Sequence, residues 1–267
     1  MSNYKNWVYT HNPFASALKR SYRRTQTIVL DHKAKLSHYA NDPNLDRFYQ
    51  RILPLAETWN TTYLNWLNAV GKRKRRTQEV TDKLHLLSSD LIELWSITVQ
   101  LEHRKYTPVY QEFFKEGRNP FQKGRMDERI ARVGTLSEAL KSFPTLVSLQ
   151  QEVEQFYKDV CEAREEQLRF EAETRTLSAE LKRLLDVLAK GLFQNMLGLA
   201  ELYVDTPDFV TRFFRMELIR RVNRPSALFF EEVLTEEEME EEALEGFPFE
   251  DTPVVIEEEE ADDEFIG

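Results

Sequence analysis

Residues 145–203 read TLVSLQQEVEQFYKDVCEAREEQLRFEAETRTLSAELKRLLDVLAKGLFQNMLGLAELY, and this stretch decides the fold. Its apolar residues recur in steps of three and four without an intervening proline: Leu146, Leu149, Val153, Phe156, Val160, Ala163, Leu177, Leu181, Leu184, Leu188, Leu192, Leu199 and Leu202. That spacing places them along one side of an α-helix. A stripe of this kind needs a partner surface, so the rest of the chain is expected to supply matching helices.

The middle of this stretch, residues 164–176, is almost wholly polar. Two structures fit the pattern. One continuous helix, rising about 1.5 Å per residue, would project well beyond a compact domain. A hairpin of two antiparallel helices, with a tight turn near residues 173–176, would keep the domain compact. We expect the hairpin, because a projecting polar section has no visible surface to pack on.

Helical periodicity also runs through residues 13–40, 44–70, 77–104, 127–143 and 206–225. Pro54 predicts a kink, or two abutting helices, in the second of these segments. Gly71 suits a helix end, which makes residues 72–76 a loop. The segment 77–104 is expected to be central. The aromatic residues with heptad spacing are expected to lie in the core: Trp59, Tyr63, Trp66 and Trp95.

Residues 115–125 contain the only strong turn chemistry, with Gly117 and Gly124 on either side of Pro120 and Phe121. A loop of this kind can carry function. We expect it instead to cross between two halves of the bundle, each of three helices, with Phe121 tucked beneath it.

The composition agrees with an all-α fold. The 267 residues include 8 glycines and 10 prolines, too few for the many tight turns of a strand-rich fold. The sequence therefore predicts an antiparallel helical bundle of about six to eight helices over residues 1–225. No stretch is apolar enough to span a membrane. The single cysteine, Cys161, cannot form an internal disulfide, which favours a reducing, cytoplasmic location.

Charge is divided very unevenly along the chain. Residues 231–267 hold 18 acidic residues and no Lys or Arg, so the first 230 residues hold 28 acidic and 36 basic ones. The body thus carries about +8 and the tail −18. Residues 226–267 are expected to form a largely disordered acidic tail. Residues 226–244 can form an amphipathic helix only conditionally, because their glutamates repel one another.

No catalytic, metal or cofactor signature is found. The nearest match to a carboxylate–histidine metal motif is one Asp82-x-x-His85 without a second copy. His32, His38 and His103 are isolated and expected at the surface or its edge. No glycine-rich phosphate loop or serine nucleophile motif occurs. The sequence predicts a non-enzymatic protein without metal or cofactor.

The charge division supports two functional hypotheses. In the first, an adaptor protein docks its acidic tail on a partner with a basic groove, through apolar points at Phe229, Phe230, Phe247, Phe249, Val255, Ile256, Phe265 and Ile266. In the second, nucleic acid binds a basic patch that the tail masks, formed by Arg20, Arg23, Arg24, Lys72, Arg73, Lys74, Arg75, Arg76, Arg212, Arg215, Arg220 and Arg221.

Two simpler roles remain open. The basic face and the acidic tail can merely neutralise each other and keep the protein in solution. The continuous apolar seams of residues 44–70 and 77–104 would also serve a homo-oligomer.

Overall fold

The computed structural model describes residues 11–219, and this part of the chain is all-α, with no strand. The expected antiparallel helical bundle is confirmed. The helices are α2 (Pro13–Ala17), α3 (Tyr22–Ser37), α4 (Pro43–Leu86), α5 (Ile92–Glu102), α6 (Pro108–Phe113), α7 (Asn119–Gln122), α8 (Met126–Leu140), α9 (Val147–Leu202) and α10 (Met216–Ile219). Tighter 3-10 turns cover Leu18–Arg20, Pro144–Leu146 and Pro207–Phe213, and a π-helical turn covers Leu87–Leu91. The tail beyond residue 219 lies outside the described residues.

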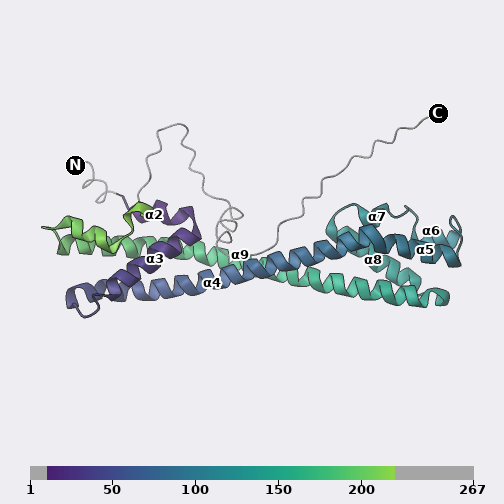
Figure 1. Ribbon diagram of the computed structural model, residues 1–267, viewed down its shortest axis with the longest axis horizontal. Coiled ribbons are helices and arrows are strands. Elements are labelled where there is room, and N and C mark those ends of the chain that lie inside the picture. Colours follow the sequence, from purple (N-terminus) through teal and green to yellow (C-terminus); the bar gives the residue numbers. More distant parts are fainter. Residues whose placement is uncertain (1–10, 220–267) are drawn as a thin grey trace, which may run out of the picture.

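Two long helices form the axis of the molecule. α4 (purple to blue in Figure 1) and α9 (teal to green) lie side by side and run in opposite directions. We call this pair the rod. With 56 residues, α9 is about 84 Å long at 1.5 Å per residue. The predicted hairpin is therefore wrong: residues 173–176 lie inside one continuous helix.

The predicted loop at residues 72–76 is also wrong, because α4 continues through Gly71 and the basic run to Leu86. Both errors have one physical cause. The polar middle of α9 packs on the polar middle of α4, so each supplies the partner surface that the other lacks in sequence. α4 likewise continues through Pro54 as a single helix.

One end of the rod carries the first hydrophobic core. Here α2, α3, α10 and the turn Pro207–Phe213 cover the first half of α4 and the second half of α9. The aromatic seam of α4 lies inside this core, as predicted. Trp59 and Trp66 are fully buried, and the ring of Tyr22 meets the ring of Trp66 edge-on at 5.1 Å.

The other end carries a second, separate core, in which α5, α6, α7 and α8 pack on the second half of α4 and the first half of α9 (Figure 1). Phe121 is buried here, as predicted. The segment 115–125 lies within this core, between α6 and α8, while α4 and α9 join the two cores. The loop is thus no crossover between the two ends.

α5 is not the central helix that the sequence predicted. Trp95 is buried, but Leu94, Ile97 and Leu101 lie on the outer face, and Leu101 is 82% exposed. The π-helical turn Leu87–Leu91 adds one residue to a helical turn and so shifts the faces of α5 relative to α4. No helix in residues 11–219 is long and apolar enough to cross a membrane.

Two glycines of the rod give a test of helix continuity. A Cβ at Gly198 would lie 2.5 Å from the ring of Phe48, so Gly198→Ala is expected to lower the free energy of unfolding. A Cβ at Gly71 meets nothing within 4 Å, so Gly71→Ala is expected to stabilise a continuous α4 by about 0.5–1 kcal/mol. Chemical denaturation measures both. Destabilisation by Gly71→Ala would indicate that α4 ends at this residue.

A second prediction concerns the π-helical turn. Arg129 on α8 donates hydrogen bonds to the carbonyl oxygens of Leu84 (2.6 Å) and Phe121 (2.8 Å) and to Ser88 Oγ (2.6 Å). Arg129→Met is expected to cost about 1–3 kcal/mol of unfolding free energy, because these buried acceptors lose their donor. Arg132→Met, at an exposed position on the same helix, is the control and should change little. Equal effects of the two substitutions would contradict this role for Arg129.

Candidate functional site at the waist of the rod

The two cores leave between them a segment of the rod that we call the waist, comprising residues 71–79 of α4 and 164–180 of α9. The buried layer of α9 is unusually polar here: Gln167, Phe170, Thr174 and Ser178. Gln167 Nε2 donates to Thr77 Oγ1 at 2.9 Å, and Trp66 Nε1 donates to Ser178 Oγ at 3.0 Å. Because these bonds require specific partners, they fix the register of α4 against α9.

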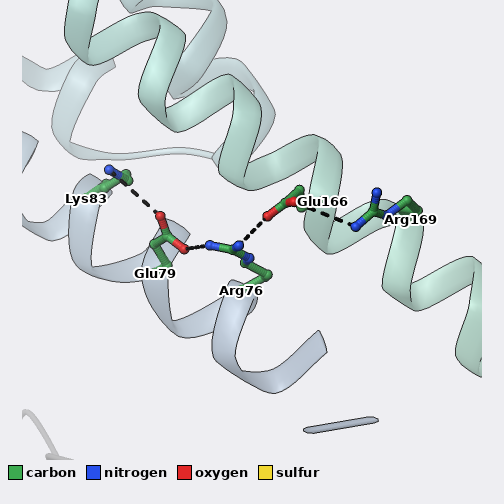
Figure 2. Close-up of polar contacts among 5 residues, drawn as sticks. All are labelled: Arg76, Glu79, Lys83, Glu166 and Arg169. Carbon is green, nitrogen blue, oxygen red and sulfur yellow. Dashed lines mark hydrogen bonds and ion pairs between the residues drawn. The ribbon is translucent and has the colours of Figure 1, made fainter. Parts of the chain in front are cut away.

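Charged side chains extend this polar contact to the surface (Figure 2). Arg76 pairs with Glu79 on its own helix and, through Nη2, with Glu166 of α9 at 2.6 Å. The Glu79 hydrogen bond, with the Glu166 charge adding to it, raises the pKa of Arg76 above its usual value. The chain of contacts continues from Glu79 to Lys83 at 4.0 Å and from Glu166 to Arg169 at 3.6 Å.

Beside this network lies an open hollow of about 220 Å³, lined by Arg76, Glu79, Lys83, Asp159, Glu162, Ala163 and Glu166. Its acids and bases pair mainly with one another, as solvated helix faces do. Within residues 11–219, no group of three or more His, Cys, Asp or Glu side chains is placed to hold a metal ion.

The predicted basic run divides into two groups at the waist. Lys72, Lys74 and Arg75 are exposed, whereas Arg73 and Arg76 are half-buried. The Lys72 ammonium lies 5.4 Å from the ring centre of Phe170, and the Arg169 guanidinium lies 4.8 Å from it. Cations therefore surround the one aromatic side chain of the waist layer.

Residues 20–24 lie close to this region. Tyr22, at the start of α3, contacts Trp66, and its hydroxyl donates to the Ser178 carbonyl oxygen at 3.5 Å. The first turn of α3 therefore reaches the edge of the waist, with Arg23 exposed and Arg20 half-buried. Arg24 points elsewhere: its guanidinium donates to the Leu218 carbonyl oxygen at 2.9 and 2.6 Å and so fastens α10 to α3.

The other predicted residues do not join this group. Arg212 lies over the ring of Phe209, near Tyr203 at the outer end of the first core, and Arg215 pairs with Glu217 at 2.9 Å. Arg220 and Arg221 lie outside the described residues. So do the apolar points of the tail, which are Phe229, Phe230, Phe247, Phe249, Val255, Ile256, Phe265 and Ile266.

One residue that the sequence placed at the surface is fully buried. His32 stacks on Phe214 with ring centres 4.3 Å apart, and its Nδ1 lies 2.8 Å from the Phe213 carbonyl oxygen. Its Nε2 lies 3.1 Å from Nδ2 of Asn195 on α9. His32 thus fastens the C-terminal turns to the rod. Helical spacing from the buried Ile28 and Leu36 was the sequence signal that pointed inward.

Burial lowers the pKa of His32 from 6.5 to about 4. Since the unfolded chain binds this proton more readily, the stability that neutral His32 contributes is complete above pH 6.5 and is lost as pH falls towards 4. A shift of this size corresponds to about 3 kcal/mol. The free energy of unfolding is therefore expected to fall more steeply between pH 7 and 4.5 in the natural chain than in His32→Gln. Parallel pH profiles in urea denaturation would contradict this account.

Comparison of the chain with protein-family models, curated proteins and solved structures finds no match, so the waist and the fold have to be interpreted from this chain's own residues.

Proposed function

We propose that this protein is a non-enzymatic adaptor whose acidic tail, residues 231–267, docks on a partner with a basic groove. The observation that carries the proposal is the division of charge, −18 in the tail against about +8 in the remainder. The arrangement of the body supports it. Within residues 11–219, two hydrophobic cores are built on one stiff pair of helices, a body able to carry such a segment.

The composition of the tail suggests how such docking would work. Its carboxylates speed the encounter with a basic surface through long-range attraction. Isolated apolar residues between them supply affinity and register when they enter pockets on the partner. Phe247, Phe249 and Phe265 are the largest such side chains in residues 231–267. The rod would hold this segment on a stiff body.

The adaptor proposal is tested by affinity purification with matched variants. The tail variant Phe247→Ala/Phe249→Ala/Phe265→Ala is compared with Leu94→Ala/Ile97→Ala/Leu101→Ala, which removes exposed apolar side chains from α5. A basic protein should be retained by the natural chain and the α5 variant but lost by the tail variant, with unchanged melting temperatures. A captured protein is then purified and titrated directly. Identical capture by all three chains, or a destabilised tail variant, would contradict the proposal.

A nucleic-acid-binding role is the second candidate, favoured by the exposed cations Lys72, Lys74 and Arg75 at the waist. The facing helix weakens it, because Glu162, Glu165, Glu166, Glu171 and Glu173 lie along the same part of the rod and lower its positive potential.

Titration with labelled duplex DNA and single-stranded RNA separates the two candidates. The chain is tested with and without residues 231–267, at low and at moderate salt. The adaptor proposal expects no binding in any combination. Strong binding by the shortened chain that weakens steeply with salt would favour the nucleic-acid role instead.

A further inference from the structure

We infer that the waist carries a docking surface for the chain's own first acidic run, residues 231–245. The surface, which we call the basic corner, covers the exposed side of α4 at the waist, where Lys72, Lys74 and Arg75 project in different directions at about 100° per residue. It is completed by Lys19 and Arg23 at the start of the neighbouring α3. This intramolecular contact stands independently of any partner. Only its regulatory consequence, competition with a partner for the tail, rests on the proposed function.

The acidic run and the basic corner are complementary in charge. Residues 231–245 hold nine glutamates and no Lys or Arg. All five side chains of the basic corner are exposed. Glutamates of α9 lower the positive potential here too, but within residues 11–219 Glu79 and Glu166 pair with Arg76 and Glu171 pairs with Arg175. No carboxylate of this part of the chain forms an ion pair with Lys72, Lys74 or Arg75. The partial positive charge at the N-terminus of α3, a helix of 16 residues, adds to this field.

The last described residues of the chain are bonded to the first turn of α3. The described chain ends at Ile219, which is buried in the first core, and Arg24 ties the neighbouring Leu218 to the first turn of α3. That turn contacts Trp66 through Tyr22. Lys74 lies eight residues further along α4, or about 12 Å at 1.5 Å per residue. The described chain therefore ends in the first core, which also contains Tyr22 of the first turn of α3.

Only a short segment joins the end of the described chain to the acidic run. Eleven residues lie between Ile219 and Glu231, and the twelve steps from one to the other reach at most about 40 Å when fully extended. Because the acidic run is tethered to the body over so short a length, its effective concentration at the corner is of the order of millimolar. Weak, solvent-exposed ion pairs are enough to hold it under such conditions, and the contact remains reversible.

The consequence is that the tail stays bound to its own body until a partner or salt displaces it, and we call this intramolecular contact the latch. While residues 231–245 lie on the basic corner, their carboxylates are partly neutralised and are withheld from other basic surfaces. A partner has to compete with the corner, so weakly basic proteins are rejected and a strongly basic groove is selected. The latch opens with rising ionic strength, because exposed ion pairs are screened.

The test is a distance measurement within the full-length chain by pulsed electron paramagnetic resonance. Spin labels are placed at Asn68→Cys on the exposed face of α4 and at Met239→Cys in the acidic run, with Cys161→Ser removing the natural thiol. At low salt we expect a narrow distance distribution. It should become broad in about 0.5 M salt, where the Debye length is only about 4 Å.

Charge reversal locates the contact. Lys72→Glu/Lys74→Glu/Arg75→Glu should give the broad distribution even at low salt. The control Lys115→Glu/Lys123→Glu/Arg132→Glu makes the same change in net charge at exposed positions on the segments that cover the other end of the rod. It should retain the narrow distance distribution. Far-UV circular dichroism and thermal melting of each variant establish that the helices are intact. A broad distribution in the natural sequence, or one unaffected by the waist reversal, would overturn the inference.

This experiment needs no partner, so it remains separable from the adaptor proposal. A narrow distribution together with failed affinity purification would leave the latch standing and remove the adaptor role. A broad distribution together with successful affinity purification would remove the latch and leave a tail that is always available to its partner.

Discussion

The pairing of α4 with α9 is the contact on which the rest of the structure depends. Each helix carries apolar stripes at its two ends and a polar section in its middle. Antiparallel packing brings like to like, apolar against apolar at each end and polar against polar at the waist. The bonds from Gln167 to Thr77 and from Trp66 to Ser178 select one register. A slip by one helical turn would break both bonds and move charged groups into the cores.

The rod explains why the molecule has two cores instead of one. A helix of 56 residues is too long for a single compact core, so shorter helices cover its two ends and leave the centre solvated. The C-terminal turns fold back onto the first core through His32 and Arg24, so the described chain ends at Ile219 inside that core.

Periodicity predicted the features of this fold that depend on residues close together in the sequence. Steps of three and four identified the helices, heptad aromatics such as Trp59 and Trp66 indicated the core, and two glycines around Phe121 indicated a turn over a buried ring. The errors arose where the deciding contact is distant in sequence. The polar residues 164–176 resemble a turn until Thr77 and Arg76 of another helix are placed against them. Gly71 likewise resembles a helix end in the sequence, because the contacts that support α4 beyond it, such as that of Thr77 with Gln167, come from another helix.

Two further errors have the same character. His32 was assigned by residue type to the surface, although its spacing from Ile28 and Leu36 pointed inward, and its acceptor on Phe213 lies 181 residues away. The segment 77–104 was expected to be central, yet Leu94, Ile97 and Leu101 within it are exposed. A π-helical turn, which periodicity does not reveal, shifts them to the outer face of α5. For the waist, the sequence identified the basic run but not the glutamates that face it.

The most direct test of this account is the distance between spin labels at Gln155→Cys and Gln194→Cys in a Cys161→Ser background. Both positions are exposed on α9, on either side of the waist. A single helix separates them by 39 residues, which predicts a distance of about 58 Å at 1.5 Å per residue. A hairpin turning near residue 174 would bring the two positions side by side. A distance of about 10–20 Å, typical of neighbouring helices and their side chains, would contradict the rod and everything derived from it.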